Sequence, residues 1–176
     1  MHLLDCSWTA YAHTLPNSAA AYNDTLVHLA RIDSCESWGA LWPSLPVPRL
    51  FATPHLCLRF CASKERIVAL SFFREDIRPE WEDAKNTNGA TLSARVSEDA
   101  DSVHEIWISL VADCARGAAP DDVTGVQVIQ KQSRYACMVR FDIWLSCNAD
   151  HARAIAWVRE SSGIVVSKQP RQLRRN

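Results

Sequence analysis

The stretch GVQVIQKQSRYACMVRFDIWLS (Gly125–Ser146) predicts two β-strands that turn around Gln132–Arg134. Successive side chains of a strand point to opposite faces of a sheet, so the second strand should present two different faces. One face carries Tyr135, Cys137, Val139, Phe141, Ile143 and Leu145, and the other carries Ala136, Met138, Arg140, Asp142 and Trp144. An apolar face backed by a mixed face is typical of an antiparallel sheet that is covered on one side.

The rest of the chain continues this pattern of strands and helices. Strands are expected at Leu3–His13, 25–32, 55–63, 66–73 and 164–168, the third and fourth forming a hairpin around Lys64 and Glu65. Helices are expected at Ser34–Trp42, where Asp33 and Glu36 resemble a capping box, at 103–114 and at Asp150–Arg159. These elements indicate an α+β fold with a mostly antiparallel sheet and about three helices.

Length and composition favour one domain. The 176 residues are 48% hydrophobic, enough for a single core, and we assign residues 1–168 to one domain and 169–176 to a basic tail. The 19 basic and 20 acidic residues nearly balance, which excludes a general polyanion-binding surface. A bound nucleic acid would have to be short and held by local contacts.

Cysteine usage and hydropathy bear on the compartment. The seven cysteines are irregularly spaced, and neither a signal peptide nor a membrane-length apolar run is found. We therefore expect reduced, mostly buried thiols in a cytoplasmic protein, with the nucleus as a second location. His55, Cys57 and Cys61 lack a second ligand pair at zinc-site spacing, so no metal site is expected.

A charged loop in the stretch FFREDIRPEWEDAKNTNG (Phe72–Gly89) carries a tryptophan in an unusual setting. Trp81 stands directly before two acids, Glu82 and Asp83. An indole can stack on a base, and one carboxylate can accept both N–H groups on the Watson–Crick edge of guanine. A positively charged base such as 7-methylguanine would add a cation–π contribution. The alternative is that Trp81 anchors the loop and the acids are solvated.

A base-binding site of this kind needs a second aromatic ring, cations for phosphates and a group that contacts a methyl substituent. The sequence offers Tyr22 in a loop, a basic cluster of Lys131, Arg134 and Arg140, and Trp144 on the same strand face as Arg140.

The motif RPEWEDAKNTNG resembles the cap-binding loop of the eukaryotic translation initiation factor 4E family, which binds the 5′ cap of messenger RNA. The segments WTAY, IDSCESWGALW, HEIWISLVADCARG and SRYACMVRFDIWLS resemble further parts of that family in the same order. The resemblance implies a curved sheet with helices on its convex face and a cap pocket on the concave side. It also implies a non-catalytic, cofactor-free protein that binds the 7-methylguanosine cap in translation initiation or its regulation.

The resemblance also assigns roles to residues. It implies that Trp81 and Tyr22 stack on the base, Glu82 reads the guanine edge and Trp144 contacts the methyl group. Arg140 and Lys131 match phosphate-binding positions, and Arg134, in a longer hairpin turn, competes with Lys131 for that role. Thr91 stands where the family has an arginine, so one phosphate contact is missing.

The partner surface departs further from the family pattern. Family members dock scaffold and repressor proteins on the convex side through a Val and a Trp of the first helix, whose positions here hold Cys35 and Gly39. We expect a monomer that binds a scaffold of the translation initiation factor 4G type or a divergent, dedicated partner. The apolar candidates for that surface are Cys35, Trp38, Trp42, Ile108 and Ala112.

Two other functions stay open at this point. A small nucleotide-processing enzyme could use Trp81 and Glu82 as a substrate clamp, although no P-loop, dinucleotide-binding or nucleophile-elbow motif is present. An interaction domain that has lost cap binding is the second alternative, because Tyr22 and Thr91 depart from the family pattern.

Overall fold

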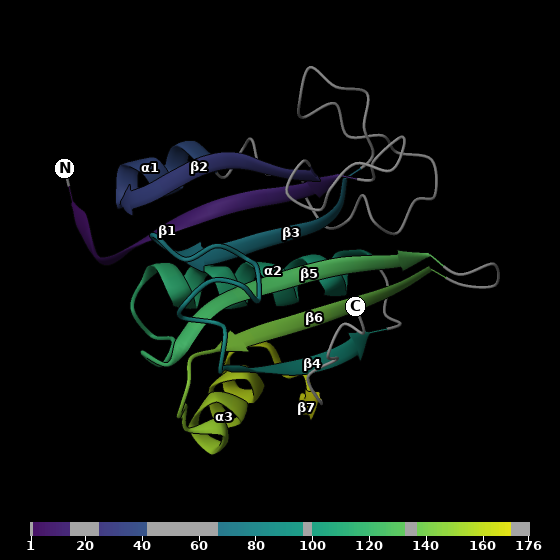
Figure 1. Ribbon diagram of the computed structural model, residues 1–176. Helices are drawn as coiled ribbons and strands as arrows, with labels where there is room; N and C mark the ends of the chain where they lie inside the picture. The colour runs from purple at the N-terminus through teal and green to yellow at the C-terminus, as the bar shows by residue number, and fades with distance from the viewer. Residues whose placement is uncertain (1, 15–24, 42–66, 97–99, 133–136, 170–176) are drawn as a thin grey trace.

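The computed structural model describes residues 2–14, 25–41, 67–96, 100–132 and 137–169, and these build one curved seven-stranded sheet with three helices (Figure 1). The strand order is β2-β1-β3-β5-β6-β4-β7, and every neighbouring pair is antiparallel. The expected α+β class with an antiparallel sheet is therefore confirmed.

The described residues form seven strands and three helices. The strands are β1 (Leu3–Thr14), β2 (Leu26–Ser34), β3 (Ile67–Arg74), β4 (Ala90–Val96), β5 (Val123–Gln132), β6 (Cys137–Leu145) and β7 (Ser167–Gln169). The helices are α1 (Cys35–Leu41), α2 (Ala100–Ala115) and α3 (His151–Ser162).

The convex face of the sheet carries the main core. Alternate strand residues such as Phe72 and Phe141 are fully buried there, together with apolar residues from α2 and α3. Trp8 stacks on Phe72 with ring centroids 5.1 Å apart and an interplanar angle of 2°. Trp107 and Trp157 are buried in this core as well. Burial of apolar surface on this scale is the main driving force for the fold.

The opposite, concave face carries a second and smaller cluster. Phe73, Ile77 and Trp144 are buried together, and Tyr11 and Trp81 pack against them. Gly125 pairs with Phe73 in register, and a Cβ added at Gly125 would lie 2.5 Å from the Phe73 ring. Only a glycine leaves room for that ring, so Gly125 allows Phe73 to lie beside Trp144.

Three sequence expectations need correction. Strand β4 was not predicted, because ATLSARV interleaves small and polar residues rather than forming an apolar run. The cap of α1 is Ser34 rather than Asp33: Ser34 Oγ accepts from Ser37 N–H at 3.1 Å, and Ser37 Oγ accepts from Ser34 N–H at 3.0 Å. Glu36 accepts instead from the backbone N–H of His2.

The last strand is shorter and later than expected. It covers Ser167–Gln169 instead of 164–168, and Ile164 and Val166 turn their side chains into the core. Gln169, which we had placed in the tail, is thus the end of β7. The hairpin strand expected at 55–63 and the tail beyond Gln169 lie outside the described residues.

Four cysteines are described as free thiols, and these four are not mostly buried. Cys114 is buried and Cys6 half-buried, whereas Cys35 and Cys147 are exposed. In the described part of the chain, none of the helices has the length and apolar character needed to cross a membrane.

Candidate functional site

The loop that joins β3 to β4 is held in one shape by a buried asparagine. Asn86 is fully buried and donates through Nδ2 to the carbonyls of Arg78 (2.8 Å) and Glu80 (3.0 Å). Its Oδ1 accepts from the hydroxyl of Thr124 on β5 at 2.9 Å. At the end of the loop, a Cβ on Gly89 would lie 2.0 Å from the carbonyl oxygen of Leu145. The loop is therefore fixed against the ends of β5 and β6.

The two acids after Trp81 have different roles in this loop. Asp83 accepts from the backbone N–H groups of Arg78 and Lys85, both at 2.9 Å, so its carboxylate shapes the turn. Glu82 is exposed, and no hydrogen bond or ion pair is found for its side chain among the described residues. Glu82 is consequently the acid whose oxygens remain available to a ligand.

The aromatic residues of the concave face converge under this loop. The Trp81 and Trp144 ring centroids lie 4.2 Å apart with an interplanar angle of 33°, and Phe73 meets Trp144 edge-on at 5.5 Å. Trp81 is half-buried, whereas Trp144 is buried and its Nε1–H has no hydrogen-bond partner. Burial also raises the pKa of the neighbouring Tyr11 hydroxyl. The result is a cluster of rings in which Trp81 and Tyr11 are partly accessible.

A band of buried polar side chains crosses the same face. His13 Nε2 lies 2.8 Å from Ser71 Oγ, and Gln127 Nε2 donates to that hydroxyl at 2.9 Å. These residues come from β1, β3 and β5, and each is nearly inaccessible. Burial lowers the pKa of His13 to about 4, so the imidazole is neutral at pH 7. Buried polar groups that satisfy one another hold three strands in a fixed arrangement.

Charged groups continue the band on β6 and β4. Arg140 donates to Asp142 Oδ2 at 2.6 Å, and Ser93 on β4 donates to Asp142 Oδ1 at 2.5 Å. Arg140 faces Arg95 in the β4–β6 register. Among the described residues, no group accepts a hydrogen bond from the buried Nε–H of Arg140. This end of the band thus combines two arginines with one buried carboxylate.

The structure places some of the predicted base-site residues together. Trp81 and Trp144 are in contact, Glu82 adjoins Trp81, and Arg140 lies on the same face of β6 as Trp144, four positions earlier. Lys131 belongs to β5, opposite Met138, but its side chain lies outside the described residues, as do Tyr22 and Arg134 entirely.

Two charged residues of this face were not predicted as site residues from the sequence. They are the cation Arg95 and the acid Asp142. Arg95 was missed because β4 itself was not recognised as a strand. The alternation of Ser93 and Arg95 with the buried Ala94 and Val96 was the signal that could have revealed it.

The predicted partner residues lie on the convex side. Cys35 is exposed at the start of α1, and Ile108 and Ala112 are half-buried on α2. Trp38 is half-buried, and its ring meets Phe72 edge-on at 6.0 Å, so part of it belongs to the core. Among the described residues, no atom would lie within 4 Å of a Cβ added at Gly39, so a side chain has room there. Trp42 lies outside the described residues.

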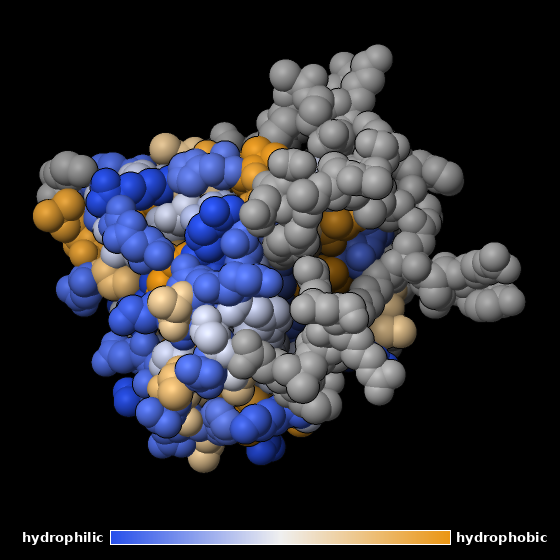
Figure 2. Space-filling model, viewed as in Figure 1, coloured by the Kyte–Doolittle hydropathy of each residue, from blue (hydrophilic) through white to orange (hydrophobic). Residues whose placement is uncertain are grey.

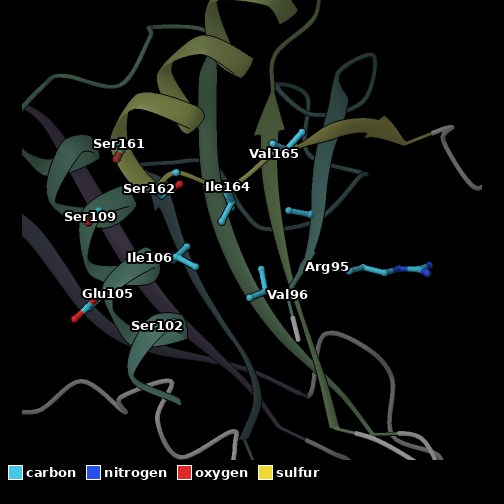
Figure 3. Close-up of a pocket in the computed structure, with 12 residues that line it drawn as sticks. Arg95, Val96, Ser102, Glu105, Ile106, Ser109, Ser161, Ser162, Ile164 and Val165 are labelled. Carbon is cyan, nitrogen blue, oxygen red and sulfur yellow. The ribbon is translucent and has the colours of Figure 1, made fainter. Parts of the chain in front are cut away.

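A separate groove of about 580 Å³ lies between α2, the end of α3 and β4 (Figure 3). Apolar side chains such as Val96, Ile106 and Ile164 line it with several serines, and Arg95 points away from it. None of the described residues that line it is aromatic, so it offers no platform for a base. Within the described ranges, no group of three His, Cys, Asp or Glu side chains is arranged to hold a metal ion.

Comparison with known proteins identifies the family. The sequence profile described as Eukaryotic initiation factor 4E matches residues 3–166. The chain belongs to this family. It is 26% identical over 153 residues to eukaryotic translation initiation factor 4E-2 of Schizosaccharomyces pombe, an alignment that covers 84% of this chain and 55% of that protein. It is 27% identical over 111 residues to eukaryotic translation initiation factor 4E of Candida glabrata, covering 61% of this chain and 46% of that protein. The chain thus spans about half the length of these relatives.

Solved structures of the family share the fold. The Ascaris suum eIF4E-3 structure with an m2,2,7G cap superposes with a TM-score of 0.77 at 17% identity, covering 97% of this chain and 92% of that one. A schistosome eIF4E complexed with m7GpppA and 4E-BP gives a TM-score of 0.73 at 21% identity, covering 97% and 88%. At these identities the likeness concerns the fold, and it confirms the curved sheet with three helices.

Proposed function

We propose that this initiation factor 4E family member binds the 7-methylguanosine 5′ cap of messenger RNA, without catalysis, in translation initiation or its regulation. The observation that carries the proposal is the half-buried Trp81, held on a rigid loop against Trp144 and followed by the exposed, unbonded Glu82. A stacked base contributes about 1–3 kcal/mol, and a bidentate edge contact about 1–3 kcal/mol more.

Binding requires Trp81 to move. Its ring already contacts Trp144, so a base does not fit between them. We infer that the Trp81 side chain turns outward, stacks on the guanine and exposes the edge of Trp144 to the N7-methyl group. Tyr22 would cover the second face of the base, with a weaker π surface than tryptophan offers. The positive charge of 7-methylguanine then favours the methylated base over guanine.

The phosphates of the cap would extend along β6 towards Arg140, with Lys131 and Arg134 as further cations. The unpartnered Nε–H of Arg140 supports this role, because an anion would supply its missing acceptor. We expect Arg140→Ala to weaken binding of 7-methyl-GTP more than binding of 7-methylguanosine. Equal losses for both ligands would remove Arg140 from the phosphate site.

A fluorescence titration tests the proposal. Quenching of tryptophan emission by 7-methyl-GTP should saturate at micromolar concentrations, about 8 kcal/mol of binding free energy, and GTP should quench far more weakly. Trp81→Ala and Glu82→Ala should each cost about 2–3 kcal/mol. Glu105→Ala, which removes an exposed acid of α2, is the matched control and should bind as the wild type does. Equal quenching by both nucleotides would contradict cap binding.

The same titration separates the rival functions. Recovery of unchanged 7-methyl-GTP after long incubation is the result expected of a binding protein. Turnover would instead support a nucleotide-processing enzyme. Absence of binding to either nucleotide would support an interaction domain without cap recognition.

For partners, the family background and the open position at Gly39 support a scaffold or binding protein that docks differently from the family pattern. Loss of a tryptophan anchor from a protein interface typically costs about 2 kcal/mol or more of binding free energy. We expect ordinary scaffold peptides to bind poorly and a dedicated partner to use Cys35, Trp38, Trp42, Ile108 and Ala112. A pull-down from cytosol with wild type and Trp38→Ala tests this: tight binding of a conventional scaffold that Trp38→Ala leaves unchanged would contradict it.

A further inference from the structure

The charged end of the concave band contains an acid where a phosphate chain would pass. Asp142 lies on β6 between Trp144 and Arg140, two residues from each and on the same face. At about 3.3 Å per strand residue, it is about 7 Å along the strand from both. A ligand with its base at Trp81 and Trp144 and its phosphates at Arg140 must therefore cross the Asp142 carboxylate.

Both oxygens of this carboxylate are occupied within the protein. Oδ2 binds Arg140 at 2.6 Å and Oδ1 accepts from Ser93 at 2.5 Å. The Asp142 side chain is only 6% exposed, whereas that of Arg140 is 27% exposed. Asp142 is thus a buried anion, and solvent reaches its partner Arg140 from one side. The Asp142 carboxylate fixes the position of the Arg140 guanidinium.

The second cation of this end comes from β4. Arg95 is the register partner of Arg140, and its side chain is exposed. Figure 3 shows this side chain extending away from α2, and alternation along β4 places it on the same face as Ser93, which binds Asp142. Like charges directly opposite each other across two strands are destabilising. In the free protein, the negative charge of Asp142 reduces the repulsion between Arg95 and Arg140. A bound phosphate chain would reduce this repulsion further.

We propose that Asp142 is a specificity-determining residue that tunes how strongly this site prefers charged phosphate chains, with Arg95 as an additional phosphate-binding cation. The inference rests on the proposed cap-binding function. Asp142 acts as an internal counter-anion: it orients Arg140, and its negative charge opposes the phosphates that Arg140 and Arg95 attract. The site consequently selects the 7-methylguanine base more than the number of phosphates attached to it.

Asp142→Asn tests the charge alone, because an amide has nearly the same shape and can keep hydrogen bonds to Arg140 and Ser93. Affinities for 7-methylguanosine and 7-methyl-GTP are measured for wild type and variant. For charges about 7 Å apart in a partly buried site, removal of the acid should strengthen 7-methyl-GTP binding about tenfold. Binding of 7-methylguanosine should stay within twofold of the wild type.

Two further variants complete the test. Glu105→Gln removes one negative charge from the α2 side and should leave the ratio of the two affinities unchanged, which separates a local effect from one of net charge. Arg95→Gln, at an exposed position that should not affect folding, is expected to weaken 7-methyl-GTP several-fold and to spare 7-methylguanosine.

The outcomes are distinct. Equal changes for both ligands in Asp142→Asn, or weaker binding of 7-methyl-GTP, would overturn the counter-anion role. Unchanged 7-methyl-GTP binding in Arg95→Gln would overturn the role of Arg95. Failure of the wild-type protein to bind either ligand would instead refute the proposed function on which this inference depends.

Discussion

The two faces of the sheet use the same strands for opposite purposes. Phe72 and Phe73 are consecutive and both buried, yet Phe72 stacks on Trp8 beneath the helices, whereas Phe73 supports Trp144 on the concave side. The convex face is a continuous apolar core. The concave face mixes a small aromatic cluster with buried histidine, glutamine, serine and aspartate side chains and the half-buried Arg140.

This difference separates an apolar face that carries most of the stability from a face whose buried polar groups must be paired. Burial of apolar side chains stabilises the fold without requiring particular partners, whereas buried polar groups are tolerated only when they are hydrogen-bonded or paired. Figure 2 views the molecule from the side opposite α2, where the described surface is mostly hydrophilic with small, separate hydrophobic patches.

The largest expected effect is a loss of unfolding free energy when a ring is removed from the convex face. Phe72→Ala removes a fully buried ring from the convex core and should lower the unfolding free energy by about 3–5 kcal/mol. Trp81→Ala removes a half-buried ring and should cost far less stability while weakening 7-methyl-GTP binding. Urea unfolding and ligand titration of both variants test this. Comparable losses of unfolding free energy in the two variants would contradict the larger contribution of the convex face to stability.

The next effect concerns pH. Burial lowers the pKa of His13 to about 4, whereas an unfolded histidine titrates near 6.5. Below pH 6.5 this histidine becomes protonated in the unfolded chain, whereas in the folded protein it stays neutral until the pH approaches 4. Stability is therefore complete above pH 6.5 and falls by up to about 3 kcal/mol as the pH drops to 4. Urea unfolding across this range should show the slope, and His13→Gln should flatten it. An unchanged slope in the variant would assign the pH effect to other groups.

A somewhat smaller effect is expected from the loop. Asn86→Ala leaves the carbonyls of Arg78 and Glu80 and the hydroxyl of Thr124 without their shared partner, which should cost about 2–3 kcal/mol of stability. Because the loop positions Trp81, 7-methyl-GTP binding should weaken as well. Asn88→Ala, at an exposed position of the same loop, is the control and should behave as the wild type. Full ligand affinity in Asn86→Ala would show that the loop needs no such anchor.

The sequence predicts the convex face better than the concave one. Alternation in the β5–β6 hairpin and the helical spacing of Val103, Leu110 and Cys114 anticipate the core, because apolar burial follows from periodicity alone. Trp81 and Glu82 could also be singled out, since a tryptophan in a charged loop is unusual.

The polar band could not be anticipated in the same way. His13 and Gln127 are 114 residues apart in the chain and meet only because β1, β3 and β5 pair in one register. The pairing of Arg140 with Asp142 depends on side-chain rotamers and on Ser93 from β4, a strand that was not predicted.

The most direct test of the central claim, that the concave cluster is the cap site, is to follow the indole N–H resonances by NMR as 7-methyl-GTP is added. The account predicts large shifts for Trp81 and Trp144, which should change contact when the base binds. The resonances of Trp8, Trp107 and Trp157 in the convex core should stay in place. Shifts confined to the convex tryptophans, with Trp81 and Trp144 unmoved, would contradict the account.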